Sequence, residues 1–406
     1  MDDDIKILYG REKKQGAVLK VIGVGGAGGN AVNRMIEEDL KGVEFIAVNT
    51  DMQVLSTIQS PALKLQIGDK ITKGLGAGSN PDIGEQAALD DTGSIIEVLE
   101  GAHMVFITAG MGGGTGTGAS HVIANHASSM GILTVAVVSK PFHFEKEKRM
   151  RVAEEGIRKL RENVDAIIII PNQKLLELGD ANITYKNAYK KADEVLLQAV
   201  RGISDIISST GSQNVDFADV KATMVGKGIT LMGTGEAKGE NRADEATKRA
   251  LNSPLLDNLA INGATGILYN ITASCTLTLA EIEKISDMIT RNADVDATIK
   301  FGVIEDENAG DTIRITVIAT GFKEGKSDFQ VRGKTPPANF IPNEPSYRQP
   351  TPTQPFLIQN RPGSSSVDVS KYVNDSNMPN MTHGPENFDD PLDIPTFQRL
   401  NPIRKK

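Results

Sequence analysis

The chain has 406 residues, a formal net charge of −8 and 39% hydrophobic residues, so it can bury a sizeable core. Its acidic balance argues against a nucleic-acid partner, because such binding needs clustered Lys and Arg. Residues 1–16 are polar and flexible in character, without the apolar stretch of a signal peptide, and no run of about 18 apolar residues predicts a transmembrane helix. The lone Cys275 forms no internal disulfide and has no histidine at metal-ligand spacing. We therefore expect a cytoplasmic protein.

Short β-branched runs alternate with amphipathic stretches after residue 16. The runs predict strands at Leu19–Val24, Glu44–Val48, Met104–Thr108, Leu133–Val138 and Ala166–Ile170. The stretches between them predict helices at Asn30–Leu40, Asp82–Leu99, Thr117–Met130 and Glu147–Asn163. This alternation is typical of an α/β domain with a doubly wound parallel sheet, which we place at residues 17–185.

A long amphipathic helix is predicted at Ala188–Ser208. A helix of about 20 residues spans roughly 30 Å, enough to bridge two domains, and we assign residues 186–222 to this helix and the loop after it. The following patterns predict strands at Ile229–Gly235, Gly263–Thr272, Thr298–Ile304 and Thr312–Thr320, with helices at Asn241–Asn252 and Leu279–Asn292. They indicate a second, smaller α/β domain at residues 223–322.

The composition changes after Phe322, because 13 of the 18 prolines but only 4 of the 40 glycines lie in residues 323–406. Residues 323–387 are polar and rich in Pro, Ser, Gln and Asn, which predicts a disordered linker. Apolar residues return in residues 388–406, so we interpret this end as a partner-binding tail peptide on a flexible tether.

Two glycine-rich loops follow predicted strands. The first contains Gly23, Gly25 and Gly28, and Asp51 lies 23 residues after Gly28, a spacing that also fits an NAD-binding fold. The second has six glycines in residues 110–118. Two phosphate cradles at one sheet edge favour a long polyphosphate over a bridging pyrophosphate. Neither loop carries a P-loop lysine, so amides, hydroxyls and a bound cation such as Mg²⁺ must meet the phosphate charge.

The second loop reads Gly112-Gly113-Gly114-Thr115-Gly116-Thr117-Gly118, which resembles the glycine signature of the tubulin/FtsZ family without a substitution. The resemblance covers about residues 15–322 and includes Asn49-Thr50-Asp51, Lys140-Pro141-Phe142 and Gly233-Thr234-Gly235. It implies a tubulin-like fold, a GTPase that binds GTP or GDP with Mg²⁺, and head-to-tail assembly in bacterial cell division. It also implies phosphate contacts from Gly26, Ala27, Gly28 and Gly29 in the first loop and from Gly112, Gly113, Gly114, Thr115, Gly116 and Thr117 in the second.

The resemblance also assigns the guanosine contacts. Asn30 and Asp193 are expected to hydrogen-bond guanine and Tyr189 to stack on it, with Glu194 as the alternative to Asp193. Glu145 and Arg149 match the family's ribose and phosphate contacts, where a glycine usually follows the glutamate and this chain has Lys146. From the residues alone, Tyr189 would be a packing aromatic, Asp193 a solvated charge, and Glu145 with Arg149 an exposed ion pair.

The segment with Asn214, Asp216 and Asp219 follows the long helix and resembles the family's catalytic loop. By itself it could bind a cation, cap a helix or polarise a water, and the helix cap is the default interpretation. Because the helix carries it about 30 Å from the glycine loops, the resemblance implies that the two acids polarise water at the nucleotide of the next subunit, with Asn214 positioning it.

The tail, Leu392-Asp393-Ile394-Pro395-Thr396-Phe397-Gln398-Arg399-Leu400, is similar to the family's terminal peptide. It implies binding to membrane tethers and division regulators, without direct insertion into the membrane. Two alternatives stay open: an NAD-binding oxidoreductase, which leaves the second loop without a use, and a non-hydrolysing tubulin-like protein, which Asp216 and Asp219 oppose.

Overall fold

The computed structural model describes residues 16–177, 183–208, 215–253 and 263–322, apart from residues 292 and 295. The predicted linker and tail peptide lie outside the described residues, and so do Asn214 and residues 1–15. Within the described ranges, no helix combines the length and apolar content needed to cross a bilayer.

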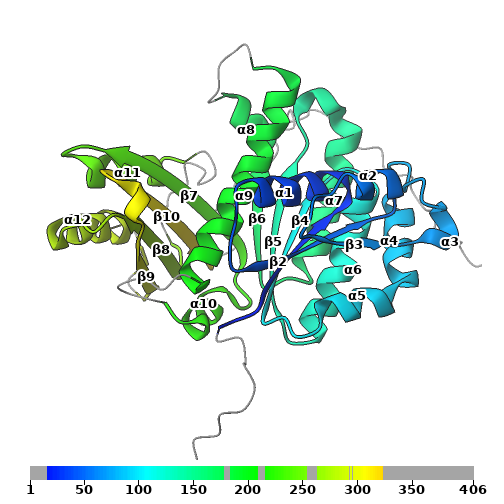
Figure 1. The fold of residues 1–406 in the computed structure, drawn as a ribbon, viewed down its shortest axis with the longest axis horizontal. Helices are drawn as coiled ribbons and strands as arrows, with labels where there is room; N and C mark the ends of the chain where they lie inside the picture. The colour runs from blue at the N-terminus through cyan, green and yellow to red at the C-terminus, as the bar shows by residue number, and fades with distance from the viewer. Residues whose placement is uncertain are drawn as a thin grey trace, which may run out of the picture. The chain divides into compact units, whose positions relative to one another are not determined.

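Ten strands of the described chain form one sheet in the order β3-β2-β1-β4-β5-β6-β7-β10-β8-β9 (Figure 1). Their bounds are β1 Leu19–Val24, β2 Val43–Asn49, β3 Leu63–Gln66, β4 Met104–Gly110, β5 Leu133–Lys140, β6 Ala166–Pro171, β7 Gly228–Lys238, β8 Gly266–Ala273, β9 Thr298–Glu305 and β10 Thr312–Thr320. All neighbours from β3 to β7 are parallel, and β10 is antiparallel to β7 and β8. The strands predicted for two domains thus join in one sheet, where residues 166–168 of β6 pair with residues 228–230 of β7.

Helices cover both faces of the parallel part. The helices of the described chain are α1 Gly25–Glu37, α2 Met52–Ser56, α3 Asp69–Thr72, α4 Pro81–Asp90, α5 Thr92–Leu99, α6 Thr115–Ser129, α7 Lys146–Arg161, α8 Asn172–Glu177, α9 Tyr185–Ser208, α10 Phe217–Met224, α11 Arg242–Leu251 and α12 Leu279–Thr290. Alternate strand residues face opposite ways, so Val21 and Phe106 pack toward α1 and α9, whereas Ile22 and Ile107 pack toward α4–α7. The doubly wound α/β arrangement predicted from the alternation is confirmed.

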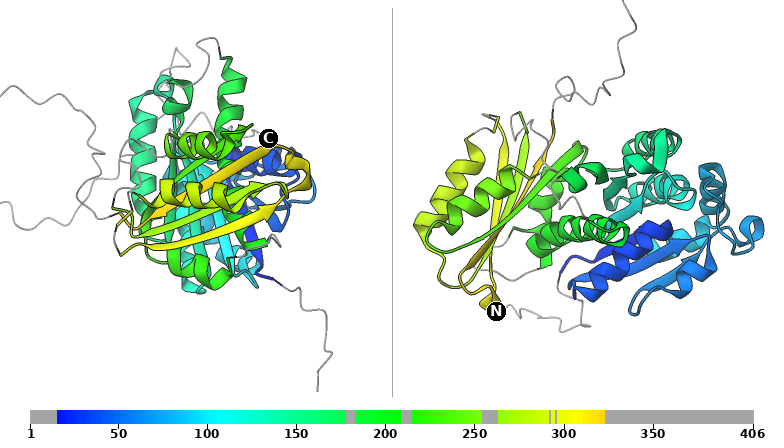
Figure 2. Two further views of the ribbon diagram at one scale, coloured as in Figure 1. Left: turned by 90° about the vertical axis from the view of Figure 1, so that its left-hand side faces the viewer. Right: turned by 90° about the horizontal axis from the view of Figure 1, so that it is seen from above.

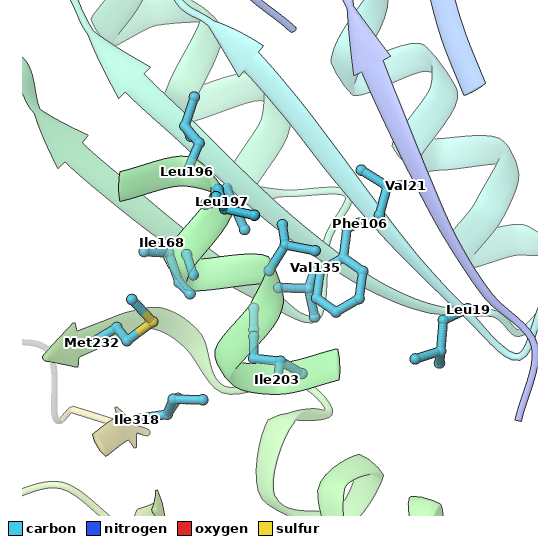
Figure 3. Close-up of a cluster of buried hydrophobic side chains, with 14 of the residues drawn as sticks. Leu19, Val21, Phe106, Val135, Ile168, Leu196, Leu197, Ile203, Met232 and Ile318 are labelled. Atoms are coloured by element: carbon cyan, nitrogen blue, oxygen red, sulfur yellow. The ribbon is translucent and has the colours of Figure 1, made fainter. Parts of the chain in front are cut away.

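Helix α9 lies between the parallel strands and the C-terminal strands (Figures 1 and 2). Its 24 residues span about 36 Å at 1.5 Å per residue. One core cluster includes Leu196 and Ile203 of α9, Val135 of β5, Met232 of β7 and Ile318 of β10 (Figure 3). The apolar stripe of this helix therefore joins both parts of the chain into one packed body.

The C-terminal part has a second face, covered by α11 and α12. Arg242 is buried there, and its guanidinium bonds Glu281 at 2.8 Å and Asp311 at 3.0 Å. The hydrogen bond from Arg242 lowers the pKa of the Glu281 carboxyl to about 2. This ion-pair network fixes α12 to the start of α11.

The structure differs from the sequence prediction in several elements, and the short helices α2, α3, α8 and α10 were not predicted. The helix expected over residues 82–99 is two helices, α4 and α5, which part at Asp91. The carboxylate of Asp91 accepts a hydrogen bond from the Gly68 amide at 2.6 Å, so a contact distant in sequence turns the chain there. The short edge strand β3 was not expected, and α1 begins at Gly25, inside the glycine segment, instead of at Asn30.

Candidate nucleotide site

The first glycine segment ends β1 and begins α1. An added Cβ at Gly28 would lie 2.4 Å from the Thr108 carbonyl oxygen of β4, so only glycine allows α1 to pack this closely on the sheet. Gly25 has φ +72°. By contrast, Gly26 and Ala27 are exposed, and an added Cβ at Gly26 meets no atom within 4 Å. The segment therefore combines glycines that pack the fold with an open face at the amino end of α1.

The second glycine segment has the same division of roles. Gly112 has φ +98°, and an added Cβ there would lie 2.7 Å from the Arg149 carbonyl oxygen. Gly114 lies against the segment before α4, where an added Cβ would be 2.9 Å from the Ala77 side chain. Gly113, between them, has open space around its Cβ position. The loop is thus held from both sides and presents Gly113 outward.

The two segments meet at the carboxyl edge of the sheet. Neighbouring positions Val24 of β1 and Ala109 of β4 are in register, and an added Cβ at Gly25 would lie 2.8 Å from the Gly116 amide nitrogen. The amino ends of α1 and α6 therefore lie side by side, and the partial positive charge of a helix amino end favours anions. This is the geometry that two phosphate cradles for one ligand require.

The two predicted threonine donors already have partners within the protein. The Thr115 and Thr50 hydroxyls bond at 2.7 Å, and the Thr117 hydroxyl accepts from the Gly112 amide at 2.8 Å. Thr117 is buried, so it first shapes the loop, although a hydroxyl that accepts one bond can still donate another.

Beside this edge, the chain turns from β5 into α7 through Glu145. The Glu145 carboxylate accepts from the Phe142 amide at 2.9 Å and pairs with Arg149 of α7 at 2.9 Å. The two side chains form an ion pair in which Glu145 is largely buried and Arg149 half exposed, so it differs from the exposed pair that the residues alone suggested. Lys146 has φ +74° and ψ 161°, which explains the glycine usual in the family at this position.

Four aromatic rings form a cluster at the start of α9: Phe142, Phe144, Tyr185 and Tyr189. The Tyr189 ring lies 5.1 Å from that of Phe142 and 4.9 Å from that of Tyr185, between centroids. Burial and the Glu145 carboxylate raise the pKa of the Tyr189 hydroxyl above its ordinary value. Tyr189 thus packs within a group of rings, with its hydroxyl protonated at neutral pH.

One turn later on α9, Asp193 and Glu194 have different surroundings. Asp193 is partly buried, and this burial raises the pKa of its carboxyl to about 7 against the opposing effect of Arg34. Arg34 lies four residues after Asn30 on α1, so both can face α9. Glu194 is exposed and lines a cleft with Gln198 and Arg201. Asp193 is the better placed of the two for a buried polar contact.

The acidic segment lies at the other end of the sheet. Phe217 of α10 packs edge-on against His103 at 6.2 Å, and His103 directly precedes β4, whose far end leads into the second glycine segment. Seven strand residues span roughly 20 Å, so Asp216 and Asp219 lie far from the glycine loops of the same chain.

Within the acidic segment, Asp216 caps α10, because its carboxylate accepts from the Asp219 amide at 2.7 Å. The cap considered for the sequence alone is therefore present. The Asp219 carboxylate instead pairs with Lys300 of β9 at 2.7 Å.

Comparison with known proteins identifies this arrangement. The model of the "Tubulin/FtsZ family, GTPase domain" matches residues 18–180, and that of the "FtsZ family, C-terminal domain" matches residues 228–323. The cell division protein FtsZ of Pseudomonas aeruginosa is 48% identical over 395 residues, covering 95% of this chain and 97% of the relative. The chain belongs to the FtsZ family. Its Coxiella burnetii relative is 51% identical over 313 residues, covering 77% of this chain and 81% of the relative.

Solved structures agree with this assignment. An FtsZ dimer from M. jannaschii matches with a TM-score of 0.72 and 44% identity, over 76% of this chain and 89% of the other. CetZ2 from Haloferax volcanii, at 20% identity and a TM-score of 0.66 over 76% and 94%, shows the same fold.

Membership of the FtsZ family removes the NAD-binding alternative. The structure adds a physical reason, because the Asp51 carboxylate that would hold a ribose caps α2 and accepts from the Gln53 and Val54 amides. The sequence analysis did not predict that Thr50, Phe142, Phe144 or Lys300 would lie at the site. Thr50 and Phe142 belong to segments that resemble the family, so that resemblance could have indicated them. The residues around Lys300 in the sequence carry no motif that indicates a functional role.

Proposed function

We propose that this chain binds GTP at the carboxyl edge of its sheet and assembles head to tail, so that the acids of one subunit complete the site of the next. Family membership makes it a tubulin-like GTPase of cell division. The main observation that supports this proposal is the distance between the glycine loops and the acidic segment, which we call the two half-sites. Phe217 of the acidic segment packs against His103 at one end of β4, and the glycine loops lie at the other end.

The glycine loops are proposed to hold the phosphates. Backbone amides of residues 26–29 and 112–117 would donate to phosphate oxygens, and Gly26 and Gly113 leave the space for close approach. Guanine would lie between Asn30 and Asp193 and stack on Tyr189, and Glu145 and Arg149 would bind the ribose and phosphate. An ionised Asp193 can accept from the N1–H and 2-amino groups of guanine, which explains a preference for this base.

Mg²⁺ fits this site as an ion shared with the nucleotide. Among the described residues no group of three or more His, Cys, Asp or Glu side chains is arranged to hold a metal, and the loops offer neutral amides and the Thr115 hydroxyl. Phosphate oxygens and water would supply most ligands, and the ion would offset phosphate charge.

Hydrolysis is proposed to occur at the joint between subunits. Asp219 and Asp216 of one subunit would orient and polarise the water that attacks the γ-phosphate held by its neighbour, with Asn214 helping to position it. Association between copies is supported by the dimeric FtsZ structure from M. jannaschii. Assembly then becomes a condition for turnover, because neither half-site is complete alone.

Two variants test this division of the site. Asp219→Ala should keep GTP affinity and lose about 10²- to 10⁴-fold in phosphate release. Asp244→Ala, which removes a partly exposed carboxylate paired with Lys248, is the matched control and should leave turnover unchanged. Turnover per subunit, measured against protein concentration, should show a threshold. Full activity far below that threshold would refute the shared site.

Mixing variants gives a sharper test. A chain that cannot bind GTP, such as Asn30→Ala with Asp193→Ala, still carries intact acids, whereas Asp219→Ala still binds GTP. A shared site predicts that mixed filaments regain part of the turnover, because some joints combine the two good halves. A self-contained site predicts no recovery at any ratio.

The tail peptide Leu392–Leu400 is proposed to dock membrane tethers and regulators that place the filament in a ring at the division site. The short apolar segment beyond a polar, Pro-rich stretch supports this role. Removal of residues 388–406 should leave assembly and turnover unchanged and abolish recruitment to the ring in cells. A truncated chain that still forms rings would contradict the proposal.

A further inference from the structure

Lys300 occupies an unusual position on the edge strand β9. Its neighbour Phe301 stacks on Tyr269 at 5.4 Å and packs with the core under α11 and α12. Because strand side chains alternate, Lys300 faces the opposite side of the sheet. Its register partner on β8, Leu268, belongs to the core cluster that also contains Val220 and Met224 of α10. The positively charged side chain of Lys300 therefore lies on the α10 side of the sheet.

The ammonium of Lys300 reaches the Asp219 carboxylate. The distance from Lys300 Nζ to Asp219 Oδ1 is 2.7 Å, and both side chains are 37% exposed. Lys300 holds this carboxylate at Oδ1, and because the Asp219 side chain remains 37% exposed, it can also contact a partner from outside the chain.

The helix that carries Asp219 is itself fixed in place. The Thr223 hydroxyl bonds the Asp219 carbonyl oxygen at 2.9 Å, and the Thr320 hydroxyl of β10 bonds the Thr223 carbonyl oxygen at 2.9 Å. Asp216 caps the same helix. With the backbone held on β10, the remaining freedom of Asp219 is its side-chain rotamers, and Lys300 restricts those.

We propose that Lys300 is a positioning residue for hydrolysis, which orients the Asp219 carboxylate toward water at the neighbouring subunit's nucleotide. This inference rests on the proposed role of Asp219. An edge-strand lysine can also serve only to prevent sheet-to-sheet aggregation, and an exposed ion pair can contribute nothing measurable to stability. Positioning differs from both, because it acts through Asp219 and on the rate of hydrolysis.

The test compares Lys300→Met and Lys300→Arg. Lys300→Met removes the charge and keeps most of the stem, so turnover per assembled subunit should fall about three- to tenfold, with GTP affinity and critical concentration unchanged. Lys300→Arg keeps a donor to Asp219 and should restore most of the rate. Lys284→Met is the matched control, since Lys284 is an exposed lysine 3.7 Å from Asp244 in the same part of the chain.

A double-mutant cycle with Asp219→Asn separates the outcomes. If Lys300 acts through Asp219, Lys300→Met should lower turnover in the parent chain and have no further effect beside Asp219→Asn. An equal fold-loss in both backgrounds would overturn the inference, because Lys300 would then act directly on the phosphate or on assembly. An unchanged rate in Lys300→Met would also overturn it, and the proposed function would survive as long as Asp219→Asn alone lost turnover. Normal turnover in Asp219→Asn would sink the proposed function itself.

Discussion

Replacing Gly113 with alanine tests whether this glycine is required for nucleotide binding and not for folding. An added Cβ at Gly113 meets no heavy atom within 4 Å, and its φ lies outside the left-handed region. Alanine also restricts the unfolded chain. We therefore expect the free energy of unfolding to stay unchanged or rise by up to about 1 kcal/mol.

The effect of Gly113→Ala on GTP should be opposite in sign. The methyl group would occupy the space through which a phosphate approaches the loop amides. Loss of one hydrogen bond to a charged group is worth about 1.5–3 kcal/mol, which weakens GTP binding about 10- to 100-fold. Titration with a fluorescent GTP analogue, beside urea unfolding without nucleotide, measures both quantities.

Gly28→Ala is the matched control in the other loop. Its Cβ would lie 2.4 Å from the Thr108 carbonyl oxygen and 2.8 Å from the Gly23 carbonyl carbon, so α1 must move off the sheet. We expect a loss of about 3 kcal/mol in unfolding free energy. If Gly113→Ala instead bound GTP as tightly as the parent chain, the phosphate would not approach Gly113 and the reasoning from open Cβ positions would be wrong.

Three further predictions concern single side chains. Lys146→Gly should raise the free energy of unfolding in urea by about 1 kcal/mol, because it relieves a positive φ in a residue with a side chain; a loss of stability would contradict this. The pKa of Asp193 is raised to about 7, so the nucleotide-free protein should lose stability as the pH rises from about 4 to 7. GTP affinity should instead increase over the same pH range, because the ionised carboxylate binds guanine. Asp193→Asn should flatten both pH profiles. The pKa of Glu281 is lowered to about 2, so its contribution to the free energy of unfolding is complete above about pH 4.5 and is lost as the pH falls toward 2. Glu281→Gln should therefore lower the free energy of unfolding by about 2 kcal/mol at pH 7, after allowance for solvent screening, and by little near pH 2. Thermal unfolding at the two pH values measures this difference.

The parallel part of the fold could be predicted because its signals are local. The runs around Leu19–Val24 and Leu133–Lys140 are buried on both faces, so an apolar stretch of strand length marks each one directly. The pairing of β6 with β7 could not be predicted in this way. It joins residues about 60 positions apart through three register pairs, and tertiary packing of α9 beneath both strands decides it.

The ends of helices were also difficult to predict from local sequence, because a contact distant in the chain can end a helix. Residues 82–99 have a helical apolar pattern throughout, yet Asp91 turns the chain because its carboxylate accepts from the Gly68 amide. The apolar pattern indicates which residues are buried, but it does not indicate that Asp91 will contact Gly68, 23 residues earlier in the chain. Lys300 is a similar case, since an isolated lysine in a strand carries no sign of the aspartate that it contacts on α10.

In the proposed arrangement, the described elements hold the two half-sites apart within one chain. Tyr189 lies near the start of α9 within the aromatic cluster, and α10 with its two acids comes after the far end of that helix. Ala199, Ile203 and Ile206 of α9 are buried in the core shared with β7 and β10, so the helix cannot bend without exposing apolar surface from both parts of the chain. Bringing Asp219 to the glycine loops of its own chain would require unpacking that core. In the proposed assembly, a second copy would need only to present its α10 end to the exposed carboxyl edge, so we expect association to be the low-energy route to a complete site.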